Sequence, residues 1–488
     1  ALGHTRLSII DLSAAGRQPM VSENGRYTLI FNGELYNFEE LRKELVGHGY
    51  SFKTNSDTEV LLRSWEKWGF KCLRRLIGMF AFCVFDKKDK SLSIVRDPFG
   101  IKPLFFKNDR NRFIFASEIS AIKEMSQSDL EINPQRAFDY LINGVQDQGL
   151  ETFVKDVKSL PPAHYLIVEL DKPAEAKMHR WWTPEYTVKR EISFEQASDE
   201  LRELFLNSIE LHLRSDVPVG VALSGGLDSS AIACCVRFLR PDSDIYTFSY
   251  IAGKSEFSEE MWVDEVNEHI HSISQKVTFS EDDLKRDIIE LIRIQGEPFC
   301  TASMYAQNRV FNAAKEAGIK VMLEGQGADE LLAGYHGYPG HRMRSLWEQR
   351  KYMLMLKFSQ NWKKWPGREN LSPWMSFFGQ ALPDTIYNKA RRVLGKGKLP
   401  EWIDNEALRD LDLILSSPRL ERSKAAKGRR VSEVLFRAMS SGGLPSLLRY
   451  GDRNSMCHSI ENRVPFLTVP IAEFLLSLPE EYLISLRG

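Results

Sequence analysis

The chain has 488 residues, of which 43% are hydrophobic and 27% charged, a composition typical of a folded protein with more than one domain. Its formal net charge of -1 provides no overall field that would attract nucleic acid or an anionic membrane. The longest apolar run, 76–85, is too short to cross a bilayer, and the six cysteines form neither a CxxC pair nor a dense disulfide framework. We therefore expect a cytoplasmic protein with no membrane or nucleic-acid partner.

Up to about residue 170, short β-type runs alternate with Gly, Pro and Asn turns. Helical patterns interrupt these runs at 38–48 and 57–68, and Asn37 stands where it can cap the first helix. This mixture predicts an α+β domain of packed sheets and helices. The runs that we assign to strands are 27–31, 78–85, 91–95, 104–106, 113–116 and 164–170.

A polar stretch at 171–191 shows no clear periodicity and separates two domains, which we place at 1–175 and 193–488. From residue 193 onward, predicted helices alternate with predicted strands, a rhythm typical of a parallel α/β sheet. The stretch 340–445 is mostly helical. The strands predicted in the second domain are 217–223, 245–250 and 319–323.

The most informative motif links a predicted buried strand to a helix. It contains two glycines, three serines and an aspartate, namely Ser224, Gly225, Gly226, Asp228, Ser229 and Ser230. The glycines let backbone N–H groups approach an anion, the hydroxyls add donors, and the helix start adds a positive dipole end. The aspartate can hold Mg²⁺ or cap the helix. This pattern is typical of loops that hold pyrophosphate when ATP is cleaved to AMP.

Three motifs near the start of the chain carry charged and amide side chains in a fixed order. They are LGHTRLSIID at 2–11, FNGELYN at 31–37 and SDTE at 56–59. Taken alone, Asn32-Gly33 is also the favoured pair for a type I′ hairpin turn.

Together, the strand-to-helix loop and these three motifs resemble the asparagine synthetase family. Its members are class II glutamine amidotransferases with an ATP-dependent synthetase domain, and the resemblance covers nearly all of the chain. It implies an α+β N-terminal-nucleophile glutaminase domain, followed by an α/β parallel-sheet PP-loop synthetase domain with a helical C-terminal part. The implied reaction is amidation of aspartate to asparagine through β-aspartyl-AMP, with ammonia from glutamine, ATP as substrate and Mg²⁺. The resemblance leaves open whether the protein forms a homodimer.

The resemblance also implies roles for individual residues. Arg6 and Asp57 would hold the carboxylate and ammonium of free glutamine, with Glu34 also on the ligand. Asn32 and the Gly33 N–H would form the oxyanion hole. The residues assigned to ATP are Leu223, Ser224, Gly225, Gly226, Asp228, Ser229, Ser230, Tyr250, Glu324 and Gly325. Those assigned to Mg²⁺ are Asp228 and Asp329, and Asp329 is also a catalytic candidate, as is Gln326.

Gln326 is a departure from the family's pattern, because it stands where well-known members have a glutamate. A neutral amide cannot act as a general base, although it can hydrogen-bond a substrate. The family's glutaminases use an N-terminal Cys as nucleophile. The first residue here is Ala1, which cannot act as a nucleophile, and the first cysteine is Cys72. We interpret the chain as lacking both ends of the family's sequence, and we expect it to bind nucleotide but not to hydrolyse glutamine.

Other functions remain as alternatives. Gln326, and Thr468 at a position where the family usually has Asp, also suit a related enzyme that amidates or cyclises another carboxylate, such as a sugar acid or a β-lactam precursor. His336 and His341 fit a Gly-rich loop beside the active site better than a metal pair. A catalytically inactive binding protein is a further alternative.

A nucleic-acid-binding or tRNA-modifying module would use a basic surface, but the glutaminase motifs and the net charge count against it. We interpret the basic cluster instead as solvated helix faces over a Trp-containing core. Its members are Lys363, Lys364, Arg391, Arg392, Lys396, Lys398, Lys427, Arg429 and Arg430, interleaved with Trp362, Trp365 and Trp402.

Overall fold

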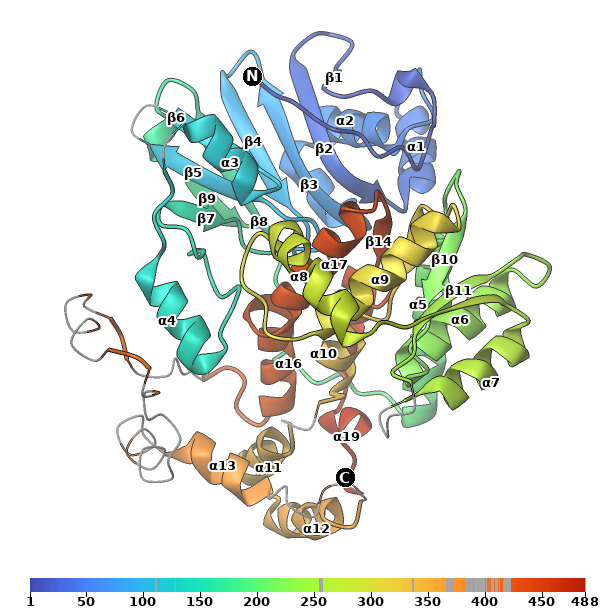
Figure 1. Ribbon diagram of the computed structural model, residues 1–488, viewed down its shortest axis with the longest axis vertical. Helices are drawn as coiled ribbons and strands as arrows, with labels where there is room; N and C mark the ends of the chain where they lie inside the picture. Colours follow the sequence, from blue (N-terminus) through green and yellow to red (C-terminus); the bar gives the residue numbers. More distant parts are fainter. Residues whose placement is uncertain are drawn as a thin grey trace.

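A computed structural model shows two domains that share a continuous interface (Figure 1). It describes the whole chain apart from residues 110–111, 128, 254–257, 336–337, 366–367, 369–372, 383–385, 387–388, 390–399, 401, 405–407, 409–410, 412, 416–422 and 488. Among the described helices, none has the length and apolar character needed to cross a membrane.

The first domain is built on a six-stranded antiparallel sheet with the strand order β1-β2-β3-β4-β8-β9. Its two long strands pair along their whole length, from Tyr27 opposite Asp86 to Leu35 opposite Gly78. The strands are β1 (Met20–Val21), β2 (Tyr27–Leu35), β3 (Gly78–Asp86), β4 (Ser91–Arg96), β8 (His164–Glu169) and β9 (Lys177–Arg180). Since β9 pairs with β8, this sheet extends beyond residue 175, where we expected the first domain to end.

Both faces of this sheet are covered, so its central strands are buried on both sides. In β3, Phe80 and Phe82 pack toward α1 (Phe38–Gly47) and α2 (Asp57–Trp68), while Ala81 and Cys83 pack on the opposite face. That opposite face is covered by a three-stranded antiparallel sheet with the order β6-β5-β7. The layers of sheet and helix confirm the predicted α+β class.

The smaller elements of the first domain complete these layers. The second sheet consists of β5 (Phe105–Asp109), β6 (Arg112–Ala116) and β7 (Val157–Ser159). The remaining helices are α3 (Ile119–Ser126) and α4 (Pro134–Asn143), with short 3₁₀ turns at Ala14–Gly16, Gly69–Arg75 and Pro173–Glu175.

The capping role predicted for Asn37 was wrong, although helix α1 does begin directly after it. The Asn37 side chain makes no cap hydrogen bond. Its Nδ2 donates to the Arg75 carbonyl at 2.8 Å, and its Oδ1 accepts from the Ile77 N–H at 2.9 Å. The asparagine therefore links the start of α1 to the chain that leads into β3.

The second domain contains the predicted parallel sheet, with five strands in the order β12-β11-β10-β13-β14. Helices α5, α6 and α7 contribute to the apolar cluster on one face, and α9 contributes to the cluster on the other. The strands are β10 (Val219–Ala222), β11 (Tyr246–Tyr250), β12 (Ile273–Val277), β13 (Val321–Leu323) and β14 (Glu461–Arg463). The helices are α5 (Phe194–His212), α6 (Leu227–Leu239), α7 (Glu260–Ile270), α8 (Glu281–Gln295) and α9 (Ser303–Glu316).

The rest of the second domain is helical, and part of it lies at the bottom of Figure 1. Its helices are α10 (Ala328–Leu332), α11 (Pro339–Glu348), α12 (Tyr352–Trp362), α13 (Pro373–Ala381), α16 (Arg430–Ser441), α17 (Leu444–Met456), α18 (Val469–Ser477) and α19 (Glu480–Leu483). One apolar cluster joins the domains, because Tyr36 and Phe99 of the first belong to the same buried group as Val464 and Leu467 of the second.

The basic cluster is only partly a solvated surface. Arg429 and Arg430 are each 7% exposed, and Arg430 is paired with Glu348 and Glu433. Trp362 is buried, as expected, but Trp365 and Trp402 are exposed. His341 lies in α11. Some residues of the two predictions lie outside those that the structure describes. They are Arg391, Arg392, Lys396 and Lys398 of the basic cluster, and His336 of the predicted Gly-rich loop.

Candidate active sites

The loop 224–230 lies at the carboxyl end of β10, the central strand of the parallel sheet. The chain passes from β10 to β11 and β12 on one side, and later enters β13 and β14 on the other. Strand order therefore reverses at β10, and such a switch point opens a crevice beyond the carboxyl ends of the strands where ligands bind in α/β proteins. The loop 224–230 therefore occupies the position in the sheet that is typical of phosphate-binding loops.

Hydrogen bonds among its own groups hold the loop in shape. Ser229 Oγ lies 3.0 Å from Ser224 Oγ and 3.2 Å from the Ser224 nitrogen, which donates to it. The Gly226 N–H in turn donates to Ser224 Oγ at 3.2 Å. Helix α6 begins at Leu227, four residues earlier than its apolar periodicity indicates, so its first-turn amides belong to the loop. The amides of Leu227, Asp228 and Ser229 have no intrahelical acceptor and are available to an anion, whereas the Ser230 N–H donates to the Gly226 carbonyl at 3.1 Å.

Gly225 has φ +86°, in the left-handed region that favours glycine. A Cβ at this position would lie 3.0 Å from the carbonyl oxygen of Glu259 and 3.2 Å from Trp262 Cβ. The start of α7 therefore packs directly against the bend, and the close approach requires a residue without a side chain.

A cavity of about 370 Å³ opens beside the loop. Most residues predicted to bind ATP line it, together with Gln326 and Asp329: they are Leu223, Ser224, Gly226, Asp228, Ser229, Tyr250, Glu324 and Gly325. The lining does not include Gly225, which packs against α7, or Ser230, which lies in the first turn of α6. Sequence reasoning missed Glu259 and Gln307 on the wall, because neither belongs to a local motif.

Three carboxylates in the cavity have pKa values above their ordinary ones. Burial, together with the charge of Asp329, raises the pKa of Asp228, and burial raises the pKa of Asp329. Burial also raises the pKa of Glu324, although amide donors oppose the shift: Gln307 Nε2 lies 3.0 Å from Oε1 and Asn462 Nδ2 lies 2.5 Å from Oε2. Asp228 and Asp329 thus repel each other across the cavity, which a bound cation would relieve.

Glu330, which follows Asp329 in the chain, is not a cavity residue. It is 1% exposed, and its Oε1 accepts a hydrogen bond from the Tyr335 hydroxyl at 2.8 Å. Among the described residues, no group of three or more His, Cys, Asp or Glu side chains is arranged to hold a metal ion by itself. A divalent ion would therefore need phosphate oxygens in addition to the pair Asp228 and Asp329.

A second pocket lies in the first domain and brings together all five residues predicted for glutamine, namely Arg6, Asn32, Gly33, Glu34 and Asp57. Asn32 and Gly33 lie inside strand β2, opposite Ala81 and Phe80, so the hairpin-turn alternative was wrong. Gly33 has φ +150°, and a Cβ there would lie 2.0 Å from the Met79 carbonyl oxygen. The described lining contains no cysteine.

The two predicted clamps are already engaged with the protein. The Arg6 guanidinium donates to the backbone carbonyls of Ile10 at 3.0 Å, Asp11 at 2.5 Å and Ser13 at 2.9 Å. Asp57 is 5% exposed and its Oδ2 accepts from the Leu35 N–H at 3.0 Å.

Glu34, which we expected on the ligand, is a buried residue, 4% exposed, and its carboxyl lies against the second domain. Its Oε2 is 3.7 Å from Nη2 of Arg463, a fully buried residue of strand β14. Burial, with the nearby charges of Asp57 and Glu461, raises the pKa of Glu34 well above its usual value. The pocket wall also includes Glu461 and Lys102, which sequence reasoning missed.

Strand β14 connects the two pockets. Glu461 lines the glutamine pocket, whereas its neighbour Asn462 donates to Glu324 in the cavity beside the loop. A buried ion pair reinforces the same interface, since Lys102 Nζ lies 3.1 Å from Asp452 Oδ1, with the side chains 3% and 8% exposed. The pockets are thus two parts of one packed unit.

A phosphate-type loop at the switch point of a parallel sheet, packed against a domain of layered sheets and helices with its own polar pocket, is the arrangement expected of a glutamine amidotransferase coupled to an ATP-dependent ligase. The glutamine amidotransferase domain family matches residues 1–182, and the asparagine synthase family matches residues 200–487. The chain belongs to the asparagine synthetase family.

Relatives from three organisms resemble most of the chain. Asparagine synthetase (glutamine-hydrolyzing) 3 of Bacillus subtilis is 31% identical, with 98% of this chain and 74% of that protein covered. Putative asparagine synthetase (glutamine-hydrolyzing) 2 of Methanocaldococcus jannaschii is 32% identical, covering 73% and 71%. Amidase chry2 of Gibberella zeae is 26% identical, covering 98% and 74%. The predicted fold class and the prediction of a glutamine-dependent ligase that uses ATP are confirmed.

Proposed function

We propose that the protein amidates the side-chain carboxylate of aspartate to give asparagine, through a β-aspartyl-AMP intermediate, with ammonia derived from glutamine. The observation that carries this proposal is the cavity beside residues 224–230, which combines an anion-binding bend with carboxylates at the carboxyl edge of the sheet. Membership of the asparagine synthetase family supports the choice of reaction.

In the first step, an oxygen of the aspartate side chain attacks the α-phosphorus of ATP, and pyrophosphate leaves. The amides at the start of α6 and the hydroxyls of Ser224 and Ser229 would hold the departing pyrophosphate. Tyr250 and Leu223, at the ends of two neighbouring strands, would flank the nucleotide, and Glu324-Gly325 would border its AMP part. In the second step, ammonia attacks the acyl carbon, and AMP leaves.

Mg²⁺ fits the donor set on the cavity wall. Asp228 and Asp329 would hold it, because their mutual repulsion is relieved by a cation and because Mg²⁺ commonly combines one or two carboxylates with phosphate oxygens. When bound, the ion would offset the negative charge of the phosphates.

Gln326 would orient the substrate by hydrogen bonding, since it lines the cavity and cannot accept a proton as a base. The proton released by ammonia would then go to a carboxylate whose pKa burial has raised. Asp228, Glu324 and Asp329 are the cavity residues that meet this condition, and Glu324 is the one of them that is not assigned to Mg²⁺.

In the glutaminase half, the Asn32 side chain and the Gly33 N–H would stabilise the oxyanion formed on the glutamine amide. Asn32 Nδ2 is at present 3.3 Å from Ser117 Oγ, a long contact that a developing charge would outcompete. Arg6 would exchange one of its carbonyl partners for the glutamine carboxylate, and Asp57 would take the ammonium.

A second candidate is amidation of a different carboxylate, favoured by Gln326 in the cavity. The discriminating experiment supplies MgATP and ammonium chloride and compares acceptors by pyrophosphate release. Release that depends on aspartate, with asparagine formed in equal amount, supports the proposal. Release that depends on another acid but not on aspartate would favour the second candidate.

A further inference from the structure

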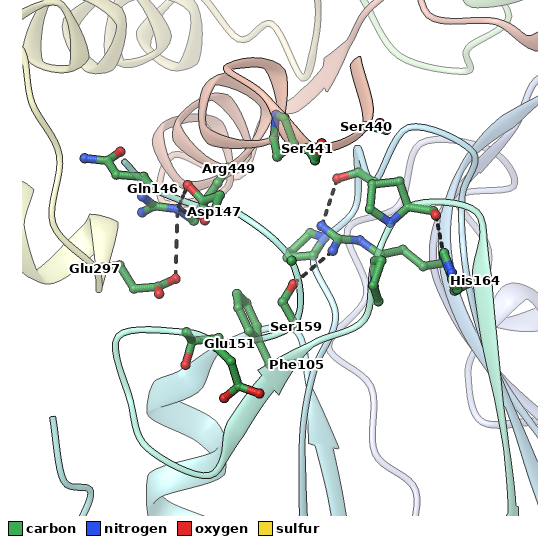
Figure 2. A pocket seen from close by; sticks show the side chains of 18 of the residues that line it. Phe105, Gln146, Asp147, Glu151, Ser159, His164, Glu297, Ser440, Ser441 and Arg449 are labelled. Carbon is green, nitrogen blue, oxygen red and sulfur yellow. Dashed lines mark hydrogen bonds and ion pairs between the residues drawn. The ribbon is translucent and has the colours of Figure 1, made fainter. Parts of the chain in front are cut away.

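A third cavity, of about 430 Å³, lies where the first domain meets helices α16 and α17 (Figure 2). None of its lining residues lines the glutamine pocket or the cavity beside the phosphate loop. The first domain contributes Arg96, Ser159, His164 and Arg180, among others, and α16 and α17 contribute Arg437, Ser440, Ser441 and Arg449. Its volume lies in the range of small-molecule binding sites.

Two of the arginines on its wall lack a carboxylate partner among the described residues. Arg96 donates to Ser159 Oγ at 3.1 Å and otherwise to backbone carbonyls, at 2.6 to 2.9 Å. Arg180 Nε donates to the Trp182 carbonyl at 2.9 Å, and its guanidinium lies over the Phe436 ring, 5.4 Å from the centroid. Burial lowers the pKa of both arginines because it destabilises their charged forms. A bound anion would offset that cost.

Arg449 adds an unpaired donor. Its side chain is 5% exposed, and its Nε lies 3.1 Å from Asp147 Oδ1 and 3.9 Å from Glu297 Oε2. Nη2 donates to the Pro298 carbonyl at 3.1 Å, but the buried Nη1 has no hydrogen-bond partner. A buried guanidinium N–H without an acceptor is costly, and a ligand oxygen would satisfy it.

The remaining lining supplies further hydrogen-bonding groups and little free negative charge. Figure 2 shows Ser440 and Ser441 on one side of the cavity and His164 on another. Asp147 is paired with Arg449, and burial raises the pKa of Glu297, which favours its neutral form. Glu151 is the remaining lining carboxylate, and it lies 3.9 Å from Lys158 Nζ. The wall is therefore richer in cationic donors than in anionic acceptors.

We propose that this cavity is a binding site for a compact dianion, either a small dicarboxylic acid or a phosphate-bearing metabolite, held by Arg180 and Arg449. Guanidinium groups pair with both chemistries through two parallel N–H donors. Because the walls come from both domains, the ligand would bridge them. This site is separate from the proposed reaction and does not depend on it.

The test is isothermal titration of the full chain at low ionic strength with inorganic phosphate, succinate and neutral succinamide. Phosphate or succinate, or both, should bind saturably, and succinamide should not. Arg180→Gln should weaken the anion's affinity by about tenfold or more, the loss expected for one charge-assisted contact. Comparison of the phosphate and succinate titrations identifies which source of the dianion the site prefers.

Arg202→Gln is a matched control, because the Arg202 guanidinium also lies over a phenylalanine ring, 5.7 Å from the centroid of Phe238, but does not belong to this lining. It should leave the affinity unchanged. If neither anion binds with a Kd below about 1 mM, or if binding is the same in Arg180→Gln as in the parent, the proposal is wrong. Equal affinity in that variant would place the anion elsewhere, for instance in the loop 224–230.

Discussion

Replacing Gly225 by alanine tests the phosphate loop at the position where its conformation is most demanding. Gly225 has φ +86°, and an added Cβ would meet the Glu259 carbonyl oxygen at 3.0 Å, Trp262 Cβ at 3.2 Å and Val263 Cγ2 at 3.2 Å. The carbonyl belongs to the first turn of α7, where it accepts hydrogen bonds from the Trp262 and Val263 N–H groups. The neighbours therefore cannot simply rotate away.

The expected loss of ATP affinity follows from two energetic costs, one of backbone conformation and one of steric contact. A left-handed conformation costs an L-residue about 1 to 2 kcal/mol, and the backbone contact requires a further small displacement of the bend. If the bend relaxes to avoid these costs, its N–H groups lose their alignment toward phosphate. We expect Gly225→Ala to weaken ATP binding by about 5-fold to 30-fold, the equivalent of about 1 to 2 kcal/mol.

Equilibrium binding of a fluorescent ATP analogue, with circular dichroism to verify folding, measures this effect. Gly318→Ala is the control, because Gly318 has a similar φ of +77°, no atom within 4 Å of an added Cβ, and a position in the turn before β13. Both variants should lose stability, but only Gly225→Ala should lose affinity. Unchanged binding by Gly225→Ala, or an equal loss in Gly318→Ala, would refute the assignment of this bend to phosphate.

Three further predictions concern the interface, the buried acid and the cavity amide. Lys102→Met should lower the free energy of unfolding by about 3 to 5 kcal/mol, because it leaves Asp452 buried without its partner. The double variant with Asp452→Leu should recover most of that loss in urea denaturation, and a double variant as unstable as the single one would argue against the pair. The pKa of Glu34 in the folded protein is raised above its ordinary value of 4.5. The free energy of unfolding therefore falls as pH rises above 4.5, because the carboxyl ionises more readily in the unfolded chain than in the folded protein. Glu34→Gln should therefore match the parent near pH 4 and exceed it in unfolding free energy by at least about 1 kcal/mol near pH 8, a gain that must be absent if the carboxyl is well solvated. Gln326→Glu should raise asparagine synthesis from ammonia, by up to about 100-fold if proton transfer limits the rate, and a loss would show that the amide itself is needed.

Local patterns predicted those parts of the molecule that local physics determines. The loop 224–230 is recognisable because glycine, hydroxyl and acidic residues follow a buried strand directly and precede a helix. Strand β3 is recognisable because its run of apolar residues is buried on both faces of a covered sheet, whereas β2 was predicted only over 27–31 and continues to Leu35. In both cases the sequence within about ten residues carries the whole signal.

Contacts between the domains could not be predicted in this way. Strand β14 reads Glu461-Asn462-Arg463, a polar triplet without β-type alternation. It is buried with its charges close together, because Arg463 pairs with Glu461 of the same strand and lies 3.7 Å from Glu34 of the first domain. Lys102 and Asp452 are 350 residues apart in the sequence, so nothing local indicates their pairing. Arg6 and Glu34 line one pocket, but their present partners, backbone carbonyls and Arg463, are fixed by tertiary packing.

Activation of the carboxylate by transfer of AMP is tested most directly by an oxygen-isotope measurement. Aspartate labelled with ¹⁸O in its side-chain carboxylate is incubated with the protein, MgATP and ammonium chloride, and the products are analysed by mass spectrometry. Because the carboxylate oxygen that attacks the α-phosphorus leaves with AMP, the account predicts one ¹⁸O atom in each AMP formed. Label in inorganic phosphate together with ADP would show attack on the γ-phosphorus and would contradict the account.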